Sequence, residues 1–294
     1  MKITNKKKLP TALENFARSH EKPWTDKHYS ATTILAPTRE ILLKRRHDGE
    51  IEMDVSDMVW LILGSAVHKI MEEHDKTGMA EISFKEKIVD EYYLTGRADL
   101  YNEETFSLED YKTASVWKMI YKDFEDWKKQ GLIYSWLLRK QGKFVQKLKF
   151  HALLKDWNSG DKRRAEFKGD YYPENPIVTW EYNVSSADIQ EIEDFINLRF
   201  RQLIDAEKLS DEELPVCSPE ERWNTGDKFA VMKEGRKTAI RVFDTEEEAK
   251  NFIKFEEPKA VIQYRPGEDK RCKDYCPAKE FCNYYHNNVK GKIE

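Results

Sequence analysis

The chain has 294 residues, of which 39% are hydrophobic and 35% are charged, and its formal net charge is −4. This length and composition allow a sizeable buried core, in one large domain or two modest ones. No apolar run approaches the roughly 20 residues that cross a bilayer, which excludes a membrane-spanning chain. The basic start lacks the apolar centre of a secretory signal, so we expect a cytoplasmic protein.

The first 30 residues are polar, and we expect residues 1–30 to form an irregular arm. Apolar residues at helical spacing then predict a helix over 38–47 and a stronger one over 55–75, with Ser56 as its N-cap. These two segments would be the first helices of the folded core.

Alternating apolar and polar residues predict strands over 81–102 and 106–114, with a turn at residues 95–96. Helical periodicity returns over 116–142. Further strands are predicted at residues 145–157 and 176–184, on either side of a polar loop over 158–175. A helix that begins with a serine cap follows at residues 185–207.

Beyond Cys217 the pattern changes to a hairpin over 228–243, a helix over 244–255 that opens with a capping box, and a strand over 259–267. The order of elements predicts an α/β core, residues 31–210, with a mixed central sheet flanked by helices. Residues 211–294 would form a small cysteine-stapled subdomain packed on that core.

Two carboxylates and a lysine stand out in the stretch GRADLYNEETFSLEDYKTAS, at Asp99, Asp110 and Lys112. Adjacent strands would bring both acids within reach of one Mg²⁺ or Mn²⁺ ion, which prefer oxygen ligands. Lys112 would share the face of Asp110 and could orient a water or offset charge on a phosphate. On their own, these three residues fit a salt-bridged surface hairpin better than a metal site.

Four motifs in this order resemble the PD-(D/E)XK nucleases. GRADL and DYKTAS resemble motifs II and III of the RecB-type branch, which includes the CRISPR-associated adaptation nucleases. That branch also carries a Gly-x-x-x-His motif, matched by Gly64 to His68, and a Gln-x-x-x-Tyr motif, matched by Gln130 to Tyr134. The resemblance covers roughly residues 30 to 150 and implies a restriction-endonuclease-like core.

The resemblance also implies roles for individual residues. The metal ligands would be His68, Asp99, Asp110, the backbone carbonyl of Tyr111 and, as a further acidic ligand, Glu86. Lys112 would be the catalytic lysine. Gln130 and Tyr134 would help to position the lysine or the DNA backbone. A helical histidine or tyrosine is otherwise usual in core packing, and Glu86 lies on a strand where Glu and Lys alternate.

Four cysteines occur, three of them close together near the end of the chain: Cys217, Cys272, Cys276 and Cys282. Without a secretory signal, a metal site is a better interpretation than disulfides. The ligand set would be the four cysteines, or three of them with His286. Related nucleases carry a four-cysteine [4Fe–4S] cluster, which the C-terminal spacing resembles; Zn²⁺ is the alternative. In those relatives the first cysteine precedes the nuclease motifs, whereas here it would be Cys217.

Residues 117–150 contain nine Lys or Arg residues and three Asp or Glu residues. This excess suits phosphate contacts, although charge runs also occur on ordinary solvated faces. The candidate DNA-binding residues are Lys118, Lys122, Lys128 and Lys129. The aromatic residues interleaved with them would stack on bases or pack in the core: Trp117, Tyr121, Phe124, Trp127 and Trp136.

The resemblance therefore implies a metal-dependent DNA nuclease, acting as an exonuclease on single- or double-stranded ends in recombination or repair, from a phage or bacterium. It implies a location in a bacterial or phage-infected cytoplasm, a single-strand annealing protein as a partner, and possible self-association. Two alternatives stay open. One is a non-catalytic DNA-binding scaffold that keeps the nuclease fold, and the other is a zinc-stapled RNA-processing factor.

Overall fold

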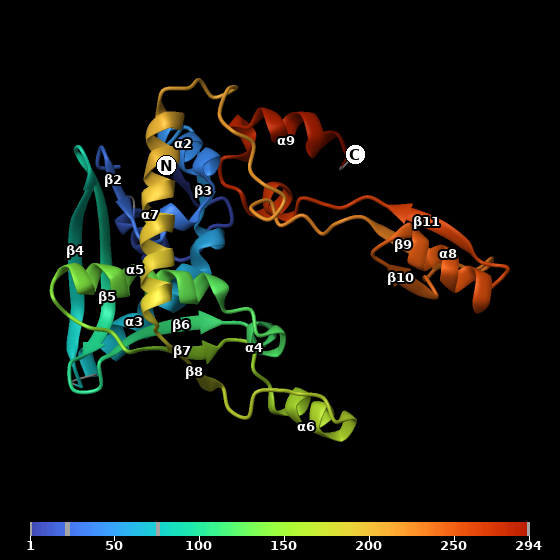
Figure 1. Cartoon of the computed structure of the whole chain (residues 1–294), viewed down its shortest axis with the longest axis horizontal. Coiled ribbons are helices and arrows are strands. Elements are labelled where there is room, and N and C mark those ends of the chain that lie inside the picture. The colour runs from blue at the N-terminus through green and yellow to red at the C-terminus, as the bar shows by residue number, and fades with distance from the viewer. Residues whose placement is uncertain (1, 21–23, 75–76, 293–294) are drawn as a thin grey trace.

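The structure is a computed structural model that describes residues 2–20, 24–74 and 77–292 (Figure 1). Within those residues, six strands form one mixed sheet in the order β2-β5-β6-β7-β8, and β4 pairs with β5. The strands are β2 (His28–Ser30), β4 (Met79–Val89), β5 (Tyr92–Asn102), β6 (Ser107–Ala114), β7 (Lys147–Leu154) and β8 (Ile177–Asn183). The β2–β5 and β6–β7 pairs are parallel and the others antiparallel, which confirms the predicted mixed sheet.

The central sheet forks between β5 and β6. β4 pairs along almost the whole of β5, so β2 and β6 must share the opposite edge of β5. β2 pairs with residues 93–95, whereas β6 pairs only with residues 100–102. Residues 96–99 of β5 therefore face a gap, and from Asp110 onward β6 is paired with β7 alone. The fork leaves side chains of both strands available for chemistry.

Helices cover the sheet and build the main core. They are α2 (Thr38–Arg46), α3 (Val59–His74), α4 (Val116–Tyr121), α5 (Glu125–Lys140) and α7 (Ser186–Glu207). α5 approaches the sheet closely at Gly131, where an added Cβ would lie 2.8 Å from Leu148 Cδ1. Ile133, Phe150 and Phe200 are completely buried between these layers. The apolar faces that predicted the helices therefore pack together in one continuous core.

The described part of the predicted irregular arm over 1–30, residues 2–20 and 24–30, contains regular elements, contrary to the prediction. β1 (Lys2–Thr4) pairs with β3 (Glu52–Asp54), and α1 (Thr11–Ser19) packs beside them. Apolar residues scattered among lysines form a small separate cluster there, with Ile3, Ala17 and Val55 buried. A few apolar residues at suitable spacing are therefore enough to fold this segment, although most of its residues are polar.

Four other features differ from the predictions. The β4–β5 turn lies at residues 90–91, with Asp90 in the left-handed region at φ 47°. The predicted helix over 116–142 is divided into α4 and α5 at Lys122, which has φ 53°. Asp54, not Ser56, caps a short 3₁₀ turn (Val55–Met58) before α3. The predicted polar loop over 158–175 contains α6 (Ser159–Lys168).

The C-terminal part divides into two pieces. β9 (Lys228–Met232), β10 (Arg241–Phe243), α8 (Glu246–Phe255) and β11 (Val261–Arg265) have a hydrophobic cluster of their own and project from the body (Figure 1). The predicted capping box at the start of α8 is present. The cysteine segment and α9 (Asn283–Asn288) instead contribute to the main core. In the described residues, no helix combines the length and apolarity needed to cross a membrane.

Candidate active site at the fork of the sheet

Asp99 stands on β5 where β6 separates from it. Its Oδ2 accepts a hydrogen bond of 2.9 Å from the backbone N–H of Tyr111 on β6. The same oxygen lies 3.2 Å from Nδ1 of His68 on α3, and this contact raises the pKa of His68 above its usual value, although burial opposes the shift. A side chain thus replaces the missing ladder bond and holds the two strands and α3 together.

Asp110 and Lys112 lie on one face of β6, as predicted. Lys112 Nζ is 2.5 Å from Asp110 Oδ2, and 8% of the Asp110 side chain is exposed. Burial raises the pKa of Asp110, while the charge of Lys112 opposes that shift and Asp99 adds to it. Lys112 therefore supplies the counter-charge of this buried carboxylate.

Gln130 and Tyr134 reach the same place from α5. Lys112 Nζ donates a hydrogen bond of 2.8 Å to Gln130 Oε1. Burial raises the pKa of Tyr134 to about 12, opposed by a hydrogen bond with Gln130. The ring of Tyr134 fills the space above Gly96, where a Cβ would lie 2.7 Å from Cε1. Six of the residues named by the sequence motifs thus each contact another member of the set: His68, Asp99, Asp110, Lys112, Gln130 and Tyr134.

A cleft of about 710 Å³ opens beside this cluster, and its wall includes His68, Trp60, Glu81 and Arg97. Glu81 on β4 forms an ion pair with Arg97 and was missed by the sequence analysis. It lies between the residues that pair with Ala98 and Leu100, so it is opposite Asp99.

The predicted acidic ligand Glu86 is not brought to the site. It pairs with Leu94, five positions along β5 from Asp99, which corresponds to about 16 Å. Because Glu and Lys residues alternate along β4, the sequence pattern alone could not predict which acid lies opposite Asp99. Glu73 on α3 also lines the cleft.

The residues at the fork fit a hard divalent cation. Mg²⁺ usually takes only one or two protein carboxylates and keeps several waters. Asp99 and Asp110 supply that number of carboxylates, one from each of the two strands that separate at the fork. Among the described residues, no three His, Cys, Asp or Glu side chains form a complete set of metal ligands. Waters and a substrate phosphate would have to complete the coordination.

The predicted DNA-binding lysines do not form one surface. Lys118 and Lys122 lie on or directly after α4, next to the end of β6. Lys128 and Lys129 lie on α5 over aromatic rings of β8 and α7. Only the α4 pair is adjacent in the chain to the strand that carries Lys112.

The aromatic residues of this region divide in the same way. Trp127 and Trp136 are buried and Phe124 is half-buried, so they pack in the core. Trp117 and Tyr121 are exposed and stack on each other, with ring centroids 5.7 Å apart.

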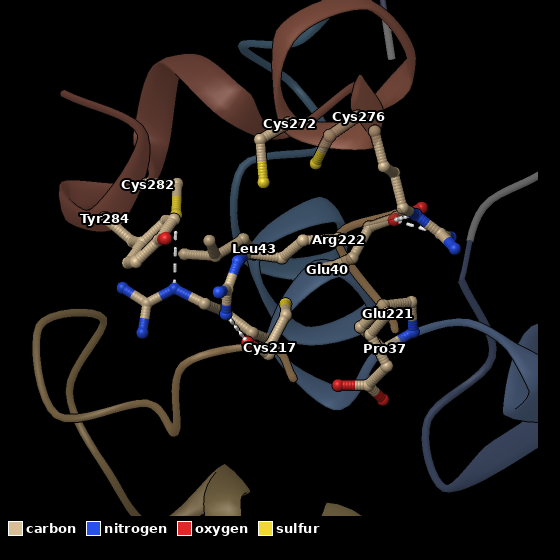
Figure 2. Close-up of a pocket in the computed structure, with 12 residues that line it drawn as sticks. Pro37, Glu40, Leu43, Cys217, Glu221, Arg222, Cys272, Cys276, Cys282 and Tyr284 are labelled. Carbon is tan, nitrogen blue, oxygen red and sulfur yellow. Dashed lines mark hydrogen bonds and ion pairs between the residues drawn. The ribbon is translucent and has the colours of Figure 1, made fainter. Parts of the chain in front are cut away.

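The four cysteines come together at a second site, away from the fork. They line one cavity of about 30 Å³ (Figure 2), between α2 and the C-terminal segment. Burial raises the pKa of Cys217 and of Cys276 to about 12, and that of Cys272 to about 11. Cys282 accepts a hydrogen bond of 3.2 Å from Arg39 Nε.

The composition of this cavity suits a thiolate-bound group. Arg39, Arg222 and Arg271 line it together with the thiols, and cations of this kind offset the charge of thiolates. His286 does not line the cavity and instead contacts the carbonyl oxygen of Glu280. The four cysteines thus line the cavity without His286, although in the described part of the chain no three such side chains are close enough to hold a metal ion.

No family model matches this chain, and no curated protein matches its sequence. Several solved structures are similar at low identity. The protein SSO0001 is 17% identical with a TM-score of 0.44, over 64% of this chain and 85% of that protein. An alkaline exonuclease from Laribacter hongkongensis is 12% identical with a TM-score of 0.39, over 61% of this chain and 89% of the enzyme. That enzyme has also been solved in complex with dAMP.

A phage-related exonuclease from Haemophilus somnus is 12% identical with a TM-score of 0.30, over 66% of this chain and 82% of that protein. Structural neighbours of this chain thus include exonucleases. Likenesses this distant carry no argument about activity, so the assignment rests on the residues at the fork.

Proposed function

We propose that this chain is a divalent-metal-dependent nuclease that hydrolyses phosphodiester bonds in DNA. The observation that carries the proposal is the convergence of Asp99, Asp110, Lys112 and His68 at the fork of the sheet, beside an open cleft. A salt-bridged hairpin explains the Asp110–Lys112 pair alone. It does not explain why α3 directs His68 to Asp99, or why α5 directs Gln130 to Lys112.

The residues divide the work of hydrolysis. Asp99 and Asp110 would hold Mg²⁺ or Mn²⁺, with His68 and the Tyr111 carbonyl as further ligands. When bound, such an ion supplies an acidified water and stabilises charge on phosphoryl oxygens. Lys112 can donate a hydrogen bond to the attacking water or to a phosphate oxygen. Gln130 accepts from Lys112 and so fixes the direction of its ammonium group.

The motif resemblance favours exonuclease action on DNA ends, in recombination or repair, and supports an annealing protein as the partner. Degradation of end-labelled linear DNA, compared with a circular DNA of the same sequence, tests this in Mg²⁺ or Mn²⁺. We expect the wild type to degrade linear DNA and Asp110→Asn to lose this activity.

Lys149→Met is the matched control. Lys149 pairs with Glu109 at 2.8 Å on the next strand, so its loss removes a similar ion pair outside the proposed site. Absence of degradation by the wild type, or equal rates for Asp110→Asn and the wild type, would refute the enzymatic proposal and leave the non-catalytic scaffold. Rapid cleavage of circular DNA would refute exonuclease action.

We further propose that Cys217, Cys272, Cys276 and Cys282 hold a [4Fe–4S] cluster, with Zn²⁺ as the alternative. The support is that four cysteines, one buried and three half-buried, line one cavity together with three arginines. Protein purified without oxygen should be brown and contain about four iron atoms per chain. Colourless protein with one zinc per chain would establish the alternative instead.

A further inference from the structure

Three exposed aromatic rings lie near the end of β6 at which the cleft opens. Trp117 and Tyr121 on α4 are 55% and 72% exposed, and their rings stack with an interplanar angle of 22°. Trp60 on α3 is 59% exposed and lines the cleft itself. Large aromatic side chains are normally buried, and a cluster left in solvent marks a surface that binds something.

A short series of contacts links these rings to one another and to the proposed active site. Lys155, which follows β7, places its Nζ 4.0 Å from the centroid of the Trp60 ring. Its backbone N–H donates to the carbonyl of Ala114, two residues beyond Lys112. The next residue, Asp156, accepts hydrogen bonds from Ser115 Oγ at 2.6 Å and from the N–H of the first residue of α4 at 2.8 Å.

Residues 155–156 therefore lie between Trp60 and α4 and hold both in fixed positions. Trp60 stays largely exposed although Lys155 lies over its ring, so it can receive a second planar partner. Lys122, directly after α4, is exposed beside Tyr121.

Aromatic faces flanked by lysines match the two chemical parts of an unpaired nucleic-acid strand. Bases stack on aromatic rings, and lysines attract the phosphates between them. A duplex offers no free base faces, so exposed rings add little to its binding. Protein partners also bind apolar patches, but the lysines beside these rings favour a polyanion.

We propose that Trp60, Trp117 and Tyr121 form a stacking platform for the unpaired bases of single-stranded DNA, which it directs into the cleft. The inference rests on the proposed nuclease function for its biological purpose. The binding itself requires no hydrolysis and can be measured separately.

The experiment measures binding of a fluorescently labelled oligothymidylate, by anisotropy, to the full chain in EDTA. The variants are Trp60→Ala and the double variant Trp117→Ala/Tyr121→Ala. Loss of stacking should weaken binding about 5- to 150-fold for each ring removed. Trp60→Phe keeps an aromatic face and should retain most of the affinity.

Phe144→Ala is the matched control. Phe144 is also 59% exposed, but it contacts Phe106 directly before β6, at the opposite end of the strand from α4. Binding by this variant should equal that of the wild type. Because all of these side chains are exposed, circular dichroism should show that each variant folds.

Equal oligothymidylate binding by the wild type and the platform variants would overturn the inference. Tighter binding of a duplex than of oligothymidylate of the same length would also overturn it. Platform-dependent binding by a protein that never degrades DNA would refute the nuclease function and leave the platform intact. Normal degradation of single strands by the platform variants would refute the platform and leave the nuclease function intact.

Discussion

Gln130→Met isolates the contact that positions the proposed catalytic lysine. The substitution keeps the length of the side chain and its preference for helix but removes the oxygen that accepts from Lys112 Nζ at 2.8 Å. A hydrogen bond from a charged donor contributes about 1.5–3 kcal/mol, and Lys112 is only 17% exposed, so water replaces the lost oxygen poorly. The ammonium group would then be held by Asp110 alone.

If that energy is lost mainly in the transition state, kcat should fall about 10- to 150-fold. KM should change little, because Gln130 is proposed to position Lys112 and not to bind DNA. The free energy of unfolding should fall by about 1–2 kcal/mol. The assay is hydrolysis of end-labelled DNA in Mn²⁺ over a range of DNA concentrations, with a urea titration of each protein.

Gln141→Met is the control, because Gln141 is an exposed glutamine directly after the same helix. Its kcat should match that of the wild type. A kcat for Gln130→Met within about twofold of the wild type would refute the reasoning that Gln130 directs Lys112. A fall in kcat for Gln141→Met of the same size would refute it too.

Three more predictions concern packing, pH and the cysteine cavity. Gly96→Ala should lower the free energy of unfolding by about 1–3 kcal/mol and displace the Tyr134 ring, whereas Gly49→Ala, with open space around it, should be near neutral in the same urea titration. Asp188 belongs to the capping box of α7, and hydrogen bonds from Ser185 and Tyr182 lower its pKa despite burial. The difference in unfolding free energy between wild type and Asp188→Asn should therefore be full near pH 6 and shrink as the pH falls below about 3.9. Urea unfolding at each pH measures this difference. A constant difference down to pH 2 would contradict this. Cys217→Ser should lose its bound iron or zinc and melt at a lower temperature than the wild type, by metal analysis and calorimetry; unchanged metal content would remove Cys217 from the ligand set.

The cluster of residues at the fork was predictable because strand and helix periodicity set their positions. Asp110 and Lys112 are two apart on a strand and so share a face, and Gln130 and Tyr134 are four apart on a helix. These spacings place the side chains on one face of their strand or helix regardless of how the rest of the chain folds. The sequence therefore identified which residues meet. It could not predict the fork, at which the backbone of Asp99 has no strand partner among the described residues on one edge of β5.

Register and turns were harder to predict because they depend on tertiary packing. Gly96 suggested a turn, but it lies within β5. A glycine is needed there because the Tyr134 ring occupies the space that a Cβ would fill. Glu81 and Glu86 are equivalent in local pattern, and only the β4–β5 pairing places Glu81 opposite Asp99. Cys217 reaches the other cysteines across an insert whose path no local pattern specifies.

The most direct test of the central claim is the rate of DNA hydrolysis by Lys112→Met relative to Lys149→Met. Each variant loses one lysine whose Nζ lies within 3 Å of a carboxylate oxygen: that of Asp110 on the same strand for Lys112, and that of Glu109 on the adjacent strand for Lys149. In Mg²⁺ or Mn²⁺, Lys112→Met should be at least about a hundredfold slower than Lys149→Met, and EDTA should abolish hydrolysis by both. Equal rates for the two variants, or hydrolysis that persists in EDTA, would contradict the account.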